Sequence, residues 1–197
     1  MTTKRIILIL GDQLDLAHPA LSDYNADTDI ILMVESSFEA NYVWSHKARI
    51  AIFLSAMRHY AQKLSDKGYR VQYIKESDLS LVEAIRNEIG RYQATHLIYV
   101  TPGEFRLKAE LESLAYESRI ELTVFEDTHF YCSFDEFSEW VGSKKEIRLE
   151  YFYRYMRKKH DILIEQDGTP VGGDWNFDDQ NRRPFPKQGP GLIPSPL

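Results

Sequence analysis

Five short apolar segments, rich in β-branched residues, alternate with longer amphipathic segments along the first two thirds of the chain. The two that come first are almost continuously apolar, which is typical of strands buried on both faces of a parallel sheet. We therefore predict an α/β fold with five parallel strands. The predicted strands are Ile6–Leu10, Asp29–Val34, Tyr69–Ile74, His96–Val100 and Glu121–Phe125.

Apolar residues recur at helical spacing between most of these strands, which predicts helices that cover the sheet. The first pattern ends at Gly68, the second is opened by Ser77 or Asp78 as N-cap, and Pro102 stands at the start of the third. This alternation predicts a Rossmann-like sheet in the order 3-2-1-4-5, with helices on both faces. The predicted helices are Val43–Lys67, Leu79–Tyr92 and Gly103–Ser118.

The alternation ends after Phe125. Phe134–Val141 and Glu146–His160 have helical patterns, and residues 162–171 resemble a hairpin around Asp167 and Gly168. From Gly172 onward the chain is polar and then rich in Pro and Gly, which is typical of a linker. We therefore expect an α/β domain over residues 1–132, a helical extension and hairpin over 133–171, and an interdomain linker of a truncated longer protein over 172–197.

Composition and charge narrow the class of protein. Hydrophobic residues make up 43% and charged residues 27% of the 197 residues, as in ordinary globular proteins. The net charge of −6 argues against a chain that is as a whole a nucleic-acid-binding module. Cys132 is the single cysteine, which excludes an internal disulfide and a cysteine-rich metal site. With no apolar run of the ~18 residues that span a membrane, we expect a cytoplasmic protein with no membrane contact.

Polar and flexible residues follow three of the predicted strands. Gly11–Leu14 follow the first, Glu35 and Ser36 end the second, and residues 101–103 end the fourth. Ligands of open parallel sheets bind at the carboxyl ends of the strands, so these segments are expected to share one crevice. The alternative for Gly11 and Asp12 is that they only form a turn and that Asp12 caps a helix.

The residue types in this crevice indicate what kind of ligand it would bind. Gly11 permits close approach to the backbone, and Asp12, Gln13 and Glu35 offer acceptors and an amide. Neither a G-x-G-x-x-G motif nor a Walker A lysine is present, and the two acidic groups disfavour an anion. The expected ligand is therefore neutral, flat and able to form hydrogen bonds.

Two further segments allow a functional and a structural interpretation. His46 and Lys47 begin the long helix, where a cation opposes the helix dipole, yet a solvated first turn with Trp44 packed on the sheet is favoured. Arg148–Lys159 interleaves basic and aromatic residues and could follow a nucleic-acid backbone. The overall acidity favours a helix that packs its aromatic side chains and solvates its charges.

Five segments of the chain together form a recognisable set: Leu8–Leu14, the run from Tyr42 to His59, Thr101–Arg106, Glu150–Arg154 and Gly172–Asp178. In this order they resemble the photolyase-related proteins of the iron–sulfur bacterial cryptochrome and photolyase group. Ser45 departs from the pair of histidines that this resemblance leads us to expect before Lys47.

The resemblance implies a light-driven DNA-repair flavoprotein or photoreceptor. Its N-terminal α/β domain would bind an antenna chromophore, 6,7-dimethyl-8-ribityllumazine. A C-terminal helical domain, expected to be missing from this chain, would hold FAD, the DNA lesion and a [4Fe–4S] cluster. The chain alone would not be catalytic, and a free-standing ligand-binding or interaction module of the same fold is the alternative. The residues expected to bind the antenna are Gly11, Asp12, Gln13, Leu14, Glu35, Ile50 and Leu54.

Overall fold

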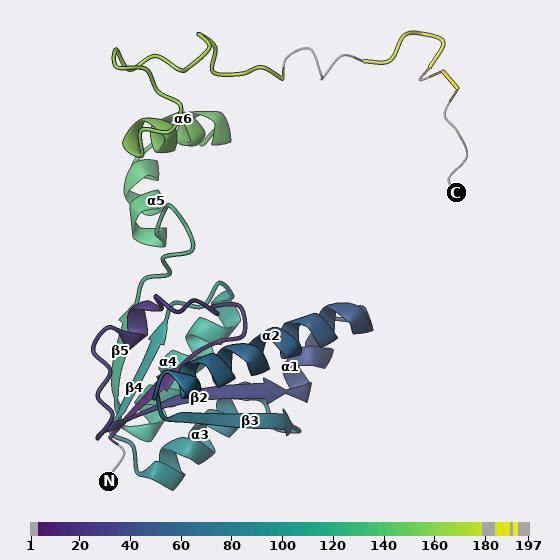
Figure 1. Ribbon diagram of the computed structural model, residues 1–197. Coiled ribbons are helices and arrows are strands. Elements are labelled where there is room, and N and C mark those ends of the chain that lie inside the picture. Colours follow the sequence, from purple (N-terminus) through teal and green to yellow (C-terminus); the bar gives the residue numbers. More distant parts are fainter. Residues whose placement is uncertain (1–3, 179–183, 190, 193–197) are drawn as a thin grey trace. The chain divides into compact units, whose positions relative to one another are not determined.

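A computed structural model describes residues 4–178, 184–189 and 191–192. The chain forms two compact units, residues 1–130 and residues 131–197. The first unit contains a parallel sheet of five strands (Figure 1). Its strands are β1 (Arg5–Leu8), β2 (Asp29–Ser36), β3 (Val71–Ser77), β4 (His96–Val100) and β5 (Glu121–Phe125).

The strand order is β3-β2-β1-β4-β5 and every pair is parallel, as the sequence predicts. From β1 the chain adds β2 and β3 on one side of the sheet and then β4 and β5 on the other side. The direction in which strands are added therefore reverses next to β1. In such folds the carboxyl ends of the strands on either side of this point leave room for a ligand. The order thus brings the ends of three strands to one edge of the sheet.

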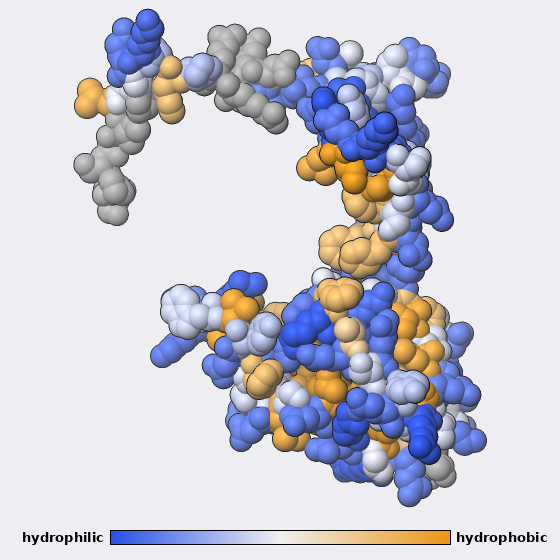
Figure 2. Space-filling model, turned by 180° about the vertical axis from the view of Figure 1, so that it is seen from behind, coloured by the Kyte–Doolittle hydropathy of each residue, from blue (hydrophilic) through white to orange (hydrophobic). Residues whose placement is uncertain are grey.

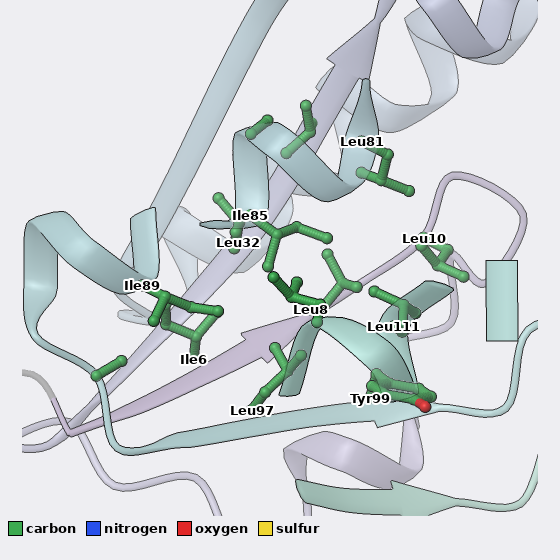
Figure 3. Close-up of a cluster of buried hydrophobic side chains, with 14 of the residues drawn as sticks. Ile6, Leu8, Leu10, Leu32, Leu81, Ile85, Ile89, Leu97, Tyr99 and Leu111 are labelled. Atoms are coloured by element: carbon green, nitrogen blue, oxygen red, sulfur yellow. The ribbon is translucent and has the colours of Figure 1, made fainter. Parts of the chain in front are cut away.

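Helices cover both faces of the sheet, and alternate residues of each strand point to opposite faces. On one face Ile6, Leu8 and Leu32 pack against α3 (Leu81–Tyr92) and α4 (Phe105–Ser118) (Figure 3). On the other face Ile7 and Ile31 pack against α2 (Lys47–Asp66) and the short 3-10 helix η1 (Pro19–Leu21). The Rossmann-like α/β architecture is confirmed.

Local capping decides where the helices begin. Helix α3 begins after Ser80, not after Ser77 or Asp78, because Ser80 and Glu83 form a reciprocal capping box. The long helix begins at Lys47 and not at Val43. The residues before it form a separate six-residue helix, α1 (Ser37–Tyr42), capped by Ser36 and not predicted from the sequence. No helix was expected over these residues, because the predicted long helix began only at Val43, and α1 lies at the tip of β2 (Figure 1).

The second unit contains α5 (Phe134–Val141) and α6 (Leu149–Lys159). Its small core is aromatic: Phe152 lies against Phe137 and Trp140, with ring centroids 5.0 and 4.9 Å apart. The predicted hairpin is reduced to one antiparallel bridge between Ile164 and Pro170. Hydrophobic side chains remain at the surface of this unit (Figure 2).

The predicted linker lies partly outside the described residues, namely at 179–183, 190 and 193–197. Its described parts, residues 172–178, 184–189 and 191–192, contain neither helix nor strand. Within the described parts of the whole chain, no helix has both the length and the apolar character that a membrane crossing requires.

Candidate functional site

A cavity of about 450 Å³ lies at the carboxyl edge of the sheet, within the first unit. The ends of β1 and β2, the loop between β4 and α4, helix α1 and the first half of α2 surround it. Most of the lining side chains are apolar, and a few charged ones are placed among them, as is usual for small-ligand sites. Five of the seven residues proposed from the sequence line it: Gly11, Asp12, Glu35, Ile50 and Leu54.

Gly11 and Asp12 are the central residues of a tight turn, which the Gln13 amide closes by donating to the Leu10 carbonyl at 3.1 Å. No helix follows this turn directly, so the alternative in which Asp12 caps a helix is wrong. Within the described residues the Asp12 carboxylate makes no hydrogen bond or ion pair, and it is exposed to solvent. It is therefore available to a ligand.

Gln13 and Leu14 are not among the lining residues. Gln13 is 1% exposed, and its amide nitrogen donates to the carbonyls of Val100 and Thr101 at 3.2 and 3.1 Å. Leu14 packs against the core on the α2 face of the sheet. Both residues anchor the loop after β1 to the rest of the domain. These contacts hold the turn at Gly11 in place.

Glu35 is 3% exposed and both of its carboxylate oxygens have partners. Arg58 on α2 donates to the two oxygens at 2.6 and 2.7 Å, and the Tyr73 hydroxyl donates at 2.6 Å. The hydrogen bonds from Arg58, joined by that from Tyr73, outweigh burial and hold the pKa of Glu35 below its ordinary value. The charge of Glu35 is therefore compensated, and its first role is to fix α2 and β3 at the cavity.

Helix α2 supplies the apolar wall through Ile50, Phe53 and Leu54. Gly11 is needed for this wall to approach, because a Cβ at Gly11 would lie 2.5 Å from Phe53 Cε1 and 2.8 Å from Met57 Sδ. Side chains of α2 thus occupy the space that a side chain at position 11 would need. Phe53 and Met57 were not among the residues that the sequence led us to expect at the cavity.

The remaining charges around the cavity form two groups. Glu39 and Glu104 are both bound by Arg106, at 2.7 Å in each case. Arg49 on α2 lines the cavity and, within the described residues, its side chain makes no hydrogen bond or ion pair. Asp12 and Arg49 are therefore the two charged side chains of the cavity wall that have no oppositely charged partner among the described residues and that could pair with a ligand. Neither Arg49 nor Arg106 was singled out from the sequence.

The structure also corrects the interpretation of the start of α2. His46 is the N-cap, and its Nδ1 accepts a hydrogen bond from the Ala48 amide at 3.2 Å. Trp44 does not pack on the sheet but is 90% exposed. The reason is that α1, which the sequence did not predict, ends at Tyr42 and leaves the following residues in an extended connection.

The basic face of α6 is largely engaged within its own unit. Arg157 is buried and donates to the carbonyls of Ile162 and Leu163. Arg154 and Lys158 lie over the Trp175 ring, 5.6 and 5.5 Å from its centroid. These contacts favour the structural interpretation of the segment over binding along a nucleic-acid backbone.

Comparison with known sequences identifies the group to which this chain belongs. Residues 7–197 match the deoxyribodipyrimidine photo-lyase-related protein family. The chain is a member of this family. The match extends over both compact units, so the helical unit is part of the family pattern as much as the sheet is.

Two relatives differ in how much of their length this photolyase-related chain covers. It is 38% identical to a (6-4) photolyase of Agrobacterium fabrum over 185 residues, which are 92% of this chain and 36% of the photolyase. The chain thus spans about a third of that relative. It is 25% identical to the uncharacterized protein R852 of Acanthamoeba polyphaga mimivirus, over 94% of this chain and 97% of that protein.

Among solved structures, a universal stress protein family member from Burkholderia pseudomallei aligns with 61% of this chain and 94% of its own. The two share 15% of their residues, with a TM-score of 0.38. A likeness this low carries no information on the function of the cavity.

Proposed function

We propose that this chain is the antenna-binding domain of a light-driven, FAD-dependent DNA photolyase or cryptochrome-like photoreceptor. In this proposal its cavity holds 6,7-dimethyl-8-ribityllumazine. The observation that carries the proposal is the cavity at the carboxyl edge of the sheet, together with the photolyase-related family. Its volume of about 450 Å³ lies in the range of small-ligand sites.

The charges and shape of the cavity support a flat, uncharged ligand of this kind. The aliphatic side chains of Ile50 and Leu54 would cover one face of the ring. Asp12 would accept hydrogen bonds from a ring N–H or the ribityl hydroxyls, and Arg49 would donate to a ring carbonyl. Asp12 and Arg49, the two uncompensated charges of the lining, are of opposite sign, which favours an uncharged ligand over an ionic one.

The redox groups of the proposal belong to a different part of a longer protein. A [4Fe–4S] cluster needs four thiolates, and this chain has the single cysteine Cys132. FAD, the cluster and the DNA lesion would therefore be bound by a C-terminal domain, the partner of this one. Such a protein would act in the cytoplasm, and light absorbed in the cavity described here would be passed on to its flavin.

A second candidate is a free-standing ligand-binding or interaction module without light chemistry. The similarity to protein R852, which is matched over 97% of its own length, favours it. The reading frame beyond Leu197 separates the two candidates. A continuation that contains cysteines supports the antenna domain, and a stop codon supports the free-standing module.

Titration with ribityllumazine tests the proposed ligand directly. We expect saturable binding at one site, followed through the fluorescence of the chromophore. Asp12→Asn should weaken binding by about 5- to 10-fold, because one charge-assisted hydrogen bond at an exposed site becomes a neutral one. The matched control is Asp27→Asn, since Asp27 is an exposed acid before β2, at the opposite edge of the sheet. Equal loss in both variants would contradict the assignment of Asp12.

A further inference from the structure

One side of the cavity is formed by a segment that adds nothing to the core. This segment, which we call the flap, comprises α1 and the connection to α2, residues 37–46. None of the residues of α1 is buried. Five flap residues nevertheless line the cavity: Glu39, Ala40, Tyr42, Val43 and Ser45. In Figure 2 the flap and the first turns of α2 project from the α/β unit.

Arg106, in the first turn of α4, joins the flap to the opposite side of the cavity. Its Nη2 donates to Glu39 Oε2 at 2.7 Å, and its guanidinium carbon lies 4.4 Å from the centroid of the Tyr42 ring. Glu104 and Glu110 hold the same guanidinium from the α4 side. The side chains of Arg106 and Glu39 are only 23% and 27% exposed, so solvent screens this pair less than a surface pair.

The other side-chain hydrogen bonds between the flap and the domain lie at its two ends, where His46 caps α2 and where the chain leaves β2. The Ser36 hydroxyl, just before the flap, donates to the Leu79 carbonyl at 2.7 Å, and Ser37 lies 3.5 Å from Asp78. Beyond Tyr42 the flap is open to solvent, with Val43 67% and Trp44 90% exposed. Segments with so few buried contacts open at low free-energy cost compared with the core.

We infer that the flap opens and closes over the cavity, and that Arg106 is the positioning residue that holds it closed. The bidentate contact with Glu39 and the stacking on Tyr42 form only in the closed arrangement, so they set the population of the open one. Access of a ligand to the cavity and its release then depend on the Arg106 contacts. The identity of this ligand rests on the proposed function, whereas the motion of the flap does not.

Amide hydrogen exchange on the ligand-free chain tests the flap. In Arg106→Gln and in Glu39→Gln, the amides of residues 40–42 in α1 should exchange about tenfold faster than in the wild type, while those of β1 and β4 stay protected. A tenfold change corresponds to about 1.4 kcal/mol in the opening equilibrium. Arg86→Gln is the control, since it removes an exposed pair with Glu117 on another surface of the same unit. If Arg106→Gln disturbs α4 itself, Glu39→Gln still tests the contact, because it weakens the same ion pair from the side of the flap.

Stopped-flow dissociation of 6,7-dimethyl-8-ribityllumazine provides the second measurement. Release should be about tenfold faster from Arg106→Gln than from the wild type, and unchanged in Arg86→Gln. Wild-type exchange of residues 40–42 in both flap variants would overturn the inference, as would unchanged release from a flap that exchanges faster. Faster exchange combined with no lumazine binding by the wild type would support the flap and contradict the proposed ligand instead.

Discussion

Ile50→Trp is expected to weaken ribityllumazine binding by at least about 100-fold while the chain stays folded. Ile50 is half-buried on α2 and lines the cavity, so an indole in its place occupies the volume that the ring of the ligand would need. A 100-fold loss corresponds to about 2.7 kcal/mol, within the range of overpacking effects. The fold should survive because α2 is anchored through its second half, by Met57, Tyr60, Ala61 and Leu64.

Ile52→Trp is the matched control for this experiment. Ile52 lies two residues further along the same helix, is 72% exposed and does not line the cavity. Circular dichroism should be the same for both variants, and only Ile50→Trp should lose the ligand. Equal binding by both would place the ligand elsewhere. If the wild type itself does not bind, the titration is repeated on a longer chain, which separates a wrong ligand from an incomplete pocket.

Acid is expected to destabilise the α/β unit through His18, by about 3 kcal/mol between pH 7 and pH 4. His18 is 2% exposed, and neither ring nitrogen has a hydrogen-bond partner among the described residues. Burial, reinforced by the neighbouring His129, lowers the pKa of His18 to about 4, although Asp127 and Asp15 oppose the shift. The unfolded chain, with a histidine pKa near 6.5, takes up the proton first. Stability present above about pH 6.5 is therefore lost as the pH falls towards 4.

Urea unfolding across this pH range measures the effect. His18→Leu should flatten the dependence between pH 6.5 and pH 4, because the variant has no buried imidazole to protonate. His59→Gln, which removes an exposed histidine on α2, should retain the slope of the wild type. The comparison concerns slopes, so it holds even where a substitution changes the stability at pH 7. An unchanged slope in His18→Leu would contradict the assignment.

The alternation of apolar and amphipathic segments determined the fold of the first unit. The boundaries of β4 and β5 agree with the sequence prediction to the residue, and the sheet order is the predicted one. Both depend on local periodicity and on the right-handed crossover of parallel strands, which any chain of this pattern obeys. The same rule indicated that the segments after β1, β2 and β4 meet at one edge.

The roles of single polar residues were decided by the tertiary structure. Glu35 was expected to face a ligand, yet Arg58 and Tyr73, 23 and 38 residues away in sequence, take up its oxygens. Gln13 was placed at the cavity by its position after β1, whereas its amide turns to the carbonyls at the end of β4. A polar side chain that lies next to a site in sequence can form hydrogen bonds with several different partners. Which partner it has depends on the residues that the fold packs around it.

In the flap, too, local sequence patterns predicted one part of the structure and tertiary packing decided the rest. The sequence from Val43 to Lys67 has one continuous helical pattern, but His46 caps α2 and leaves the residues before it as a short extended connection. Ser36 caps α1, which lies before the predicted helix. The contacts of Arg106 with the flap carry no local signal, because Glu39 and Tyr42 lie more than sixty residues earlier in the chain. Periodicity is a property of neighbouring residues and therefore determined the strands and helices. Which charges meet across the cavity depends on how those elements pack, because an ion pair forms only where folding has already brought both partners together.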